Sequence, residues 1–332
     1  MTEVNRLLFP VGHGGFAAEA IDHNYLSVID CGSDVCPTRV SMYIDALKNH
    51  RFNCVNRLFI THFDNDHVNC IKELIYKVGV KEVVVPFIPH EMRYVYNTYT
   101  KGAYLELLDL FYNRENEIEL IEINEEKTFR PNSQYDIWEW NVKCLLTEQD
   151  WKILCKEFKF KSLDINKLTS SKDSDYLDSN RKVINSCFRS AFGSGGPNSK
   201  GLIVLSQKCN NVVTNKCIIT QGCSQSLPAT YTGCLYTGDA NLKDNTQAES
   251  FVKNHLFEQR MLLTQIPHHG SKYNSNDKYV KSFNSEYYFY CDNTDKRLQD
   301  NKTLSKSLSG SGQLLNVRDC CMDLIWNQIV LK

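Results

Sequence analysis

Apolar residues along the first 90 positions occur in short runs that alternate with segments of helical spacing. Runs rich in Val, Ile, Leu, Phe or Tyr predict strands, and apolar residues three and four positions apart predict helices. Strands are expected at 7–12, 25–30, 57–61 and 82–86, and helices at 40–48 and 71–78. This β-β-α-β-α-β order is typical of a layered α/β fold.

The middle of the chain differs in character from the segments on either side. A tyrosine-rich segment at 91–116 has helical spacing, and residues 147–190 carry many basic side chains around the polar stretch T-S-S-K-D-S-D-Y. We interpret 147–190 as an inserted basic segment with one or two helices, within a single domain that spans 1–332. Further elements are expected as strands at 118–123, 138–146, 202–207, 216–220, 234–237 and 262–267, and as a helix at 247–257.

The composition narrows the class of protein. Of the 332 residues, 42% are hydrophobic and 23% are charged, and the net charge of −1 gives no overall attraction to nucleic acid or anionic membranes. No apolar run approaches the roughly 20 residues that span a bilayer, and the N-terminus lacks the pattern of a signal peptide. The 14 cysteines include no C-x-x-C pair, which indicates free thiols in a reducing compartment. We therefore predict a cytoplasmic protein without a membrane partner.

Polar residues that bind metals or move protons follow three of the apolar runs. The stretches are T-H-F-D-N-D-H at 61–67, T-G-D at 237–239 and P-H-H-G at 267–270. In layered α/β folds the carboxyl ends of the strands form the edge at which sites assemble, so the three stretches are expected to converge. Imidazole and carboxylate groups are common ligands of divalent metals. The three stretches together predict a metal site rather than an ordinary polar loop.

These residues carry a resemblance to a known family. The stretch H-F-D-N-D-H resembles the H-x-H-x-D-H signature of the metallo-β-lactamase fold, with Asp64 in place of the second histidine. The H-x-D-x-D-H variant resembles the β-lactamase-like domain of the competence protein ComEC family. Four further motifs are similar to that branch: V-G-H-G-G at 11–15, I-D-C-G at 29–32, L-Y-T-G-D at 235–239 and I-P-H-H-G-S-K at 266–272. The resemblance covers roughly 6–90 and 198–290. It implies an αβ/βα four-layer sandwich with a helical insertion.

The resemblance also implies two divalent metal ions, zinc or manganese, and a set of ligands. The implied metal ligands are His62, Asp64, Asp66, His67, Asp239 and His268. His62 and Asp64 would hold one ion, and Asp66 and His67 would hold the other. Asp239 would bridge the two ions, and His268 would complete the second site. Asp66 would also orient the attacking hydroxide, and His269 would contact the transition state, although the sequence alone does not separate the roles of His268 and His269.

Other residues are expected to orient the ligands or to contact the substrate. They are His13, Asp30, Asn198, Ser199, Ser271 and Lys272. The chain also departs from the family pattern. Relatives have a third histidine between the first motif and the bridging aspartate, but here the only histidine in that interval is His90, which we interpret as an ordinary loop residue. The histidine-proline of many relatives is absent from Y-C-D-N-T-D at 290–295.

The chemistry of such a site leads to the functional prediction. Two metal ions about 3.5–4 Å apart share a hydroxide, lower its pKa and neutralise charge on the oxygen atoms of the substrate. We predict a metal-dependent hydrolase that cleaves phosphodiester bonds, as a nuclease or phosphodiesterase acting on nucleic acid or a nucleotide. One alternative is hydrolysis of a carbonyl substrate such as a lactone or amide. Another is a degenerate, non-catalytic member that binds a partner protein through 91–116 and 147–190. The oligomeric state is left open.

Overall fold

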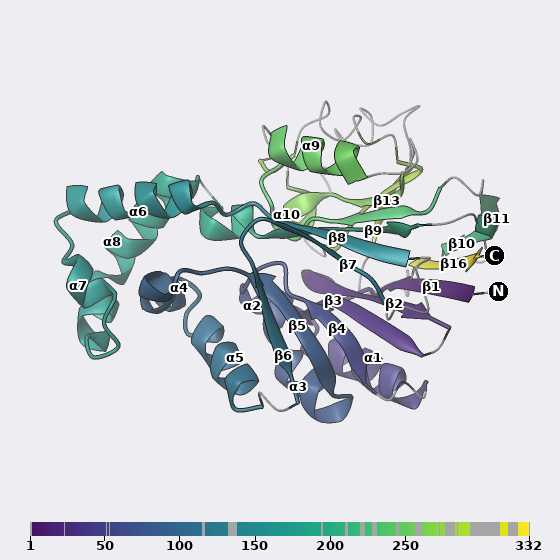
Figure 1. Ribbon diagram of the computed structural model, residues 1–332, viewed down its shortest axis with the longest axis horizontal. Coiled ribbons are helices and arrows are strands. Elements are labelled where there is room, and N and C mark those ends of the chain that lie inside the picture. Colours follow the sequence, from purple (N-terminus) through teal and green to yellow (C-terminus); the bar gives the residue numbers. More distant parts are fainter. Residues whose placement is uncertain are drawn as a thin grey trace.

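Two mixed β-sheets packed face to face form the centre of the molecule (Figure 1). The protein is represented by a computed structural model. It describes residues 2–22, 24–50, 52, 54–114, 117–131, 138–193, 195–209, 212–219, 223–227, 231–243, 246–255, 261–271, 273–275, 283, 285–292, 313–317 and 325–331.

The first sheet has the strand order β11-β10-β16-β1-β2-β3-β4-β5-β6. Its strands are β1 (Thr2–Leu8), β2 (Gly14–Ile21), β3 (Tyr25–Ser33), β4 (Val55–Phe59), β5 (Val80–Pro86), β6 (Glu119–Ile123), β10 (Val212–Ile219), β11 (Cys223–Leu227) and β16 (Ile325–Leu331). Neighbours from β3 to β6 are parallel and the remaining pairs are antiparallel. The N-terminal β1 pairs with the C-terminal β16, so the two ends of the chain meet in this sheet.

The second sheet has the order β15-β14-β13-β12-β9-β8-β7. Its strands are β7 (Glu126–Phe129), β8 (Trp138–Cys144), β9 (Leu202–Lys208), β12 (Gly233–Tyr236), β13 (Met261–Gln265), β14 (Tyr287–Tyr290) and β15 (Gln313–Asn316). The strands β12 to β15 are parallel neighbours, whereas β7, β8, β9 and β12 pair antiparallel. Both sheets therefore bring the carboxyl ends of parallel strands to an edge of the sandwich.

Helices cover the outer faces of both sheets. The helices α1 (Pro37–Asn49) and α3 (Ile71–Lys77) lie on the first sheet, and α9 (Thr246–His255) lies on the second (Figure 1). The layers run helix, sheet, sheet, helix. The predicted α/β sandwich is confirmed.

A group of helices projects from one side of the sandwich, at the left of Figure 1. It comprises α4 (Arg93–Tyr99), α5 (Ala103–Tyr112), α6 (Glu148–Phe160), α7 (Ile165–Leu168) and α8 (Ser174–Phe192), with the short 3-10 turns η1 (His90–Met92) and η2 (Gly196–Lys200). A capping box begins α6, because the Asp150 carboxylate accepts from Thr147 N at 2.8 Å while Thr147 Oγ1 accepts from Asp150 N. Three helices begin within 147–190, where the sequence predicted one or two.

A charged pair is buried between the two sheets. The side chains of Arg6 and Glu19 are fully buried, and Arg6 Nε lies 2.7 Å from Glu19 Oε1. The second sheet contributes Trp140, whose Nε1 donates to Glu19 Oε2 at 2.7 Å, and Ser206, whose Oγ donates to the same oxygen at 2.6 Å. These bonds cross from one sheet to the other and fix how the two sheets face each other.

One predicted strand is misplaced. The strand expected at 7–12 is β1, which ends at Leu8, and a turn follows before β2 begins at Gly14. Pro10 lacks the N–H that a sheet ladder needs, and Gly12 has a φ of 72°. Residues 9–13 therefore form a loop between β1 and β2.

Two further sequence predictions concern thiols and membranes. In the part of the chain that the structure describes, Cys31, Cys54, Cys70, Cys144, Cys155, Cys187 and Cys291 are free thiols. None of the described helices combines the length and apolar character that crossing a membrane requires.

Candidate metal centre

Histidine and aspartate side chains from distant parts of the sequence meet at one end of the sandwich. His62 follows β4, Asp66 and His67 lie in the short helix α2 (Asn65–Val68), and Asp239 follows β12. His269 lies in α10 (Pro267–Gly270), directly after β13. Figure 1 places α2 and α10 at the same end of the two sheets. The convergence of the three polar stretches predicted from the sequence is thus present.

The first group of ligand atoms comes from His62, His67 and Asp239, all of which are buried. His62 Nε2 lies 3.8 Å from Asp239 Oδ2, and His67 Nε2 lies 3.6 Å from Asp239 Oδ1. Both distances are too long for a hydrogen bond and leave room for an ion between the atoms.

A second group consists of His13, Asp66 and His269. His269 Nε2 lies 2.9 Å from Asp66 Oδ2, and His13 Nε2 lies 3.8 Å from the same oxygen. The two groups adjoin, since Asp239 Oδ1 lies 3.6 Å from His269 Nε2. The geometry therefore offers two neighbouring positions with nitrogen and oxygen ligands.

Buried polar atoms without partners show that the side chains fit a cation. Among the described residues, Nε2 of His62, Nε2 of His67 and Oδ1 of Asp239 have no hydrogen-bond partner. Leaving such an atom buried and unpaired costs about 1–3 kcal/mol. Three of them around one point are explained if they bind a metal ion, because imidazole nitrogen and carboxylate oxygen suit zinc, manganese and iron.

Each buried imidazole is oriented through its other ring nitrogen. His67 Nδ1 donates to Asp30 Oδ2 at 2.8 Å, and His269 Nδ1 donates to the carbonyl of Cys291 at 3.0 Å. His62 Nδ1 contacts Thr61 Oγ1 at 3.0 Å. Because Nδ1 is engaged by these contacts in each ring, Nε2 is the nitrogen that faces the centre, as in metal-binding histidines.

Asp30 organises the loop that carries these ligands without entering either group. Its Oδ1 accepts from Thr61 N and its Oδ2 accepts from Thr61 Oγ1, both at 2.7 Å. Because the Thr61 hydroxyl donates a hydrogen bond to Asp30, its oxygen accepts the one from His62 Nδ1. These contacts connect Asp30 to both His62 and His67.

The carboxylates are held in the charged form that binds metal. Burial alone would raise the pKa of Asp239, but the imidazoles of His268 and His269 outweigh it and hold the pKa well below its usual range. Burial likewise opposes ionisation of Asp66, and the neighbouring His67 and His269 still lower its pKa. Both groups are therefore ionised at neutral pH.

The backbone beside the site is in a conformation that non-glycine residues rarely adopt. The φ angles of Asp30, His268 and His269 are 54°, 51° and 54°. Each such residue costs about 1–3 kcal/mol and is retained where surrounding contacts fix it. Here His268 N donates to the carbonyl of Gly238 at 3.0 Å. The turn that places the two adjacent histidines is thus tied to the strand end that carries Asp239.

The two adjacent histidines occupy different environments. His269 is buried and belongs to the second group, whereas the His268 side chain is 31% exposed and its Nδ1 lies 3.8 Å from Asp239 Oδ2. The structure therefore groups the ligand atoms differently from the sequence interpretation, which favoured His268 as the ligand and paired His62 with Asp64.

Asp64 lies outside both groups and instead faces Asn198, which is buried. Burial raises the pKa of Asp64, and the Asn198 amide acts in the opposite direction. Asn198 Oδ1 has no hydrogen-bond partner among the described residues. The pair borders His62, whose charge also favours the ionised form of Asp64.

The remaining predicted residues serve the surrounding loops. Ser199 Oγ donates to the carbonyls of Gly196 and Phe192, and Ser271 Oγ accepts from Tyr273 N at 3.3 Å. His90 is exposed in η1 and belongs to neither group. Lys272 lies outside the described residues.

Three contributions to the site were not foreseen from the sequence. They are the Thr61 hydroxyl, the Cys291 carbonyl and the carboxylate of Asp292, which contacts His13 Nδ1 at 3.2 Å. Asp292 belongs to the stretch at 290–295, which lacks the histidine-proline of many relatives. Its position after an apolar run of tyrosines and phenylalanine was the available signal.

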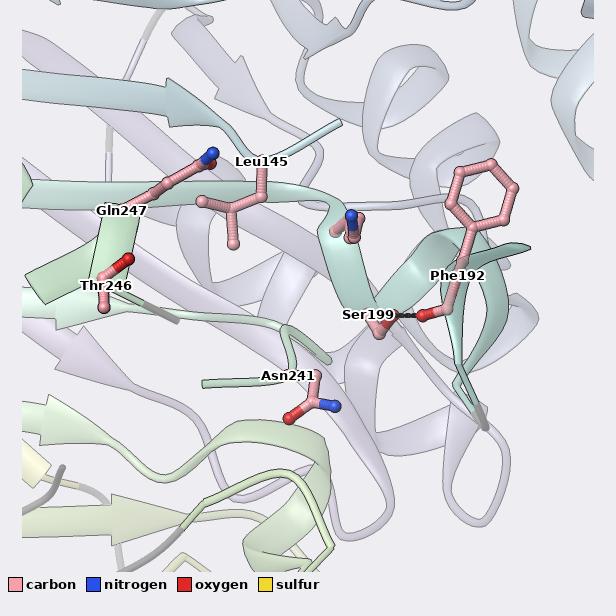
Figure 2. Close-up of a pocket in the computed structure, with 7 residues that line it drawn as sticks. Leu145, Phe192, Ser199, Asn241, Thr246 and Gln247 are labelled. Atoms are coloured by element: carbon pink, nitrogen blue, oxygen red, sulfur yellow. Dashed lines mark hydrogen bonds between the residues drawn. The ribbon is translucent and has the colours of Figure 1, made fainter. Parts of the chain in front are cut away.

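Figure 2 shows a cavity of about 300 Å³. It is lined by Leu145, Phe192, Ser199, Lys200, Asn241, Thr246 and Gln247. None of these is a candidate ligand, but Ser199 follows Asn198 directly and Asn241 N donates to Ser199 O at 2.7 Å. The lining is mainly polar, and its one cation, Lys200, pairs with Asp150.

Comparisons with known proteins give structural likenesses only. No protein-family model matches the chain, and no curated protein matches its sequence. One similar structure is Igni18, a metallo hydrolase from the hyperthermophilic archaeon Ignicoccus hospitalis, with 11% identity, 97% of this chain and 98% of that chain covered, and a TM-score of 0.47.

Two further structures have similar scores. The metallo-β-lactamase fold protein YhfI from Bacillus subtilis has 8% identity, with 98% of this chain and 100% of that chain covered and a TM-score of 0.45. A diphosphatase from the PhnP family has 8% identity, 100% of both chains covered and a TM-score of 0.45. At these scores the functional argument rests on the side chains of this chain.

Proposed function

We propose that the protein is a metal-dependent hydrolase that binds two divalent ions, zinc or manganese, and cleaves phosphodiester bonds. The observation that carries this proposal is the convergence of unpartnered Nε2 atoms of His62 and His67 on the unpartnered Oδ1 of Asp239. A structural cluster would pair these atoms with one another, whereas a metal site leaves them free to bind an ion. The H-x-D-x-D-H motif, with its ComEC-like resemblance, agrees with this proposal.

The charge of the site favours a phosphodiester as substrate. Asp64, Asp66 and Asp239 carry at most three negative charges, so two divalent ions leave the centre positive. Such ions supply Lewis acidity, which lowers the pKa of water and stabilises negative charge on substrate oxygens. The neighbouring polar cavity suits a nucleotide or a segment of nucleic acid better than an apolar group.

The residues of the chain have separate tasks in this reaction. His62, His67 and Asp239 would hold one ion, and Asp66 and His269 the other. Asp66 is the carboxylate that we assign to the attacking water, from which it would accept a hydrogen bond. His268, at the exposed rim and 3.8 Å from Asp239, is placed to donate a hydrogen bond to a substrate oxygen.

The two alternative functions make different demands on the site. Hydrolysis of a lactone or amide is favoured by an apolar pocket, and the cavity beside these ligands is mainly polar. A non-catalytic partner-binding protein has no need for buried, unpartnered ligand atoms, whose desolvation costs stability. The phosphodiester proposal accounts for both observations.

Metal analysis followed by hydrolysis tests the proposal. The wild-type protein and Asp239→Ala would be purified without chelator and their zinc and manganese contents measured by elemental analysis. We expect about two ions per wild-type chain and a marked loss in Asp239→Ala. Hydrolysis of bis(p-nitrophenyl) phosphate would then be compared with that of p-nitrophenyl acetate.

The exposed His90→Ala variant is the matched control, because it removes an imidazole that belongs to neither group. It should retain both metal and activity. A wild-type protein that binds neither zinc nor manganese would overturn the hydrolase proposal. Metal binding with cleavage of the acetate alone would favour the carbonyl substrate instead.

A further inference from the structure

We propose that His13, in the loop between β1 and β2, is a metal ligand that completes the second ion's site with Asp66 and His269, and that Asp292 positions it. The inference rests on the metal centre of the proposed function and extends it to a residue far from the other ligands in sequence.

The position of the His13 ring supports ligation. Its Nε2 lies 3.8 Å from Asp66 Oδ2, and its ring centre lies 3.9 Å from that of His269. The ligand atoms of the three residues all lie within 4.8 Å of one another. This spacing allows one ion to contact all three, because metal–ligand bonds of about 2.0–2.2 Å separate neighbouring ligand atoms by roughly 3–4 Å.

The contact of His13 with Asp292 resembles the contacts that orient His67 and His269. Nδ1 of His13 lies 3.2 Å from Asp292 Oδ1, and the Asp292 side chain is 1% exposed. Nδ1 of His67 faces Asp30, and Nδ1 of His269 faces the Cys291 carbonyl. Metal-binding histidines almost always have such a partner on the ring nitrogen that does not bind the ion.

One segment of chain orients two members of this site. Cys291 and Asp292 are adjacent and directly follow β14. The carbonyl of Cys291 holds His269, and the carboxylate of Asp292 holds His13. A loop histidine with no role in the site would not need a buried carboxylate from a strand end almost three hundred residues away.

The loop that carries His13 is fixed in place. Ser33 Oγ donates to Val11 O at 2.6 Å, and Asp34 N donates to His13 O at 3.0 Å. Gly14 packs so closely on the ligand helix that a Cβ atom there would stand 2.8 Å from Asp66 O. The backbone is therefore arranged before any ion binds, which limits the entropy lost on binding.

The test is calorimetric titration with Zn²⁺ and with Mn²⁺ of apoprotein prepared from the wild type, His13→Ala and the His90→Ala control. We expect two binding events in the wild type and control. In His13→Ala one event should weaken by more than about 100-fold, since loss of an orienting partner alone typically costs 10–100-fold. Asp292→Asn keeps an acceptor but loses the charge, and should weaken the same event by a smaller factor.

Cobalt substitution gives a second readout that does not depend on activity. The visible absorption of the Co²⁺ protein reports the ligand set, so His13→Ala should change it and His90→Ala should not. If His13→Ala does not fold by circular dichroism, His13→Gln replaces it.

The possible results separate this inference from the proposed function. Two unchanged binding events and an unchanged cobalt spectrum in His13→Ala would overturn ligation by His13 and leave the hydrolase proposal in place. A wild-type protein without metal affinity would overturn both.

Discussion

Asp30 Oδ2 accepts a hydrogen bond from His67 Nδ1 at 2.8 Å, which joins the end of β3 to the helix α2. The same carboxylate accepts two bonds from Thr61, in the loop after β4. One buried acid thereby fixes two consecutive parts of the ligand loop, and its left-handed backbone is sustained by these contacts.

The first prediction is that Asp30→Asn lowers metal affinity although Asp30 binds no metal. The amide nitrogen of asparagine donates and accepts no hydrogen bond, so whichever carboxylate oxygen it replaces, at least one donor of Thr61 or His67 loses its acceptor. We expect a loss of about 10–100-fold in zinc affinity and of about 1–3 kcal/mol in the free energy of unfolding. Zinc titration and urea denaturation measure the two effects.

Asp34→Asn is the control for this variant, because Asp34 is exposed and its carboxylate accepts a surface bond from Asn65. It should change neither quantity. Equal zinc affinity in Asp30→Asn and the wild type would show that the relay through Asp30 does not orient the ligands.

The second prediction concerns the close approach of β2 to a ligand. A Cβ atom at Gly15 would stand 2.6 Å from His67 Nδ1, well inside van der Waals contact. Gly15→Ala should therefore push the imidazole off its position and lower phosphodiester hydrolysis by about 100-fold, as small displacements of catalytic groups do. Steady-state kinetics at saturating zinc measures the effect.

Ala18→Gly serves as the control, since it changes the same strand by one methyl group away from the ligands. It should lose stability by about 0.5–1 kcal/mol but retain its rate. A Gly15→Ala protein with the wild-type rate would mean that the His67 imidazole tolerates displacement.

The strands of the fold were predictable from the sequence only in part. The strands that begin the fold were predictable because their valine, isoleucine, leucine and phenylalanine residues form short apolar runs. The strand β2 was missed because its sequence, G-G-F-A-A-E-A-I, is rich in small residues and is buried throughout, so it shows no alternation. Those small residues are needed where His67 lies against the strand.

The site was predictable to the same extent. Stretches such as 61–67 and 267–270 hold their candidate ligands close together in the sequence, so these residues could be recognised. The partners that orient the rings could not, since tertiary structure alone brings His13 and Asp292 together. A left-handed turn that buries His269 and exposes its neighbour His268 is likewise invisible in an H-H pair.

The third prediction is a loss of stability in acid that depends on Glu19. Burial alone would raise the pKa of Glu19, but the charge of Arg6 outweighs it and lowers the pKa below the ordinary 4.5. A lowered carboxyl pKa stabilises the fold above the pKa of the unfolded chain, and this contribution disappears as the pH falls through the folded value. Unfolding free energy should therefore decline as the pH falls below 4.5.

Glu19→Gln leaves Arg6 buried without its counter-charge and should lose about 3–5 kcal/mol at neutral pH, together with the part of the acid dependence that Glu19 contributes. Urea denaturation between pH 3 and pH 7 measures both. Glu249→Gln, which removes an exposed helix pair with Lys253, should change stability by no more than about 0.5 kcal/mol. If the unfolding free energy of Glu19→Gln depended on pH as that of the wild type does, Glu19 would not contribute to the loss of stability in acid.

The last prediction separates the two adjacent histidines, and each variant is the control for the other. His269 is buried in the second group with its Nδ1 held by Cys291 O, so His269→Ala should lose one metal ion and most activity. His268 belongs to neither group of ligand atoms, so His268→Ala should retain both ions. Its kcat should fall by about 100-fold, as expected for a lost hydrogen bond that strengthens in the transition state.

The measurements are metal content and steady-state kinetics on both proteins. Loss of metal in His268→Ala with full occupancy in His269→Ala would reverse the two roles and return His268 to the ligand position that the sequence favoured. Equal loss of metal in both would indicate that the left-handed turn itself, rather than either ring, maintains the site. The expected split follows from the grouping of the ligand atoms, because His269 belongs to the second group whereas His268 belongs to neither.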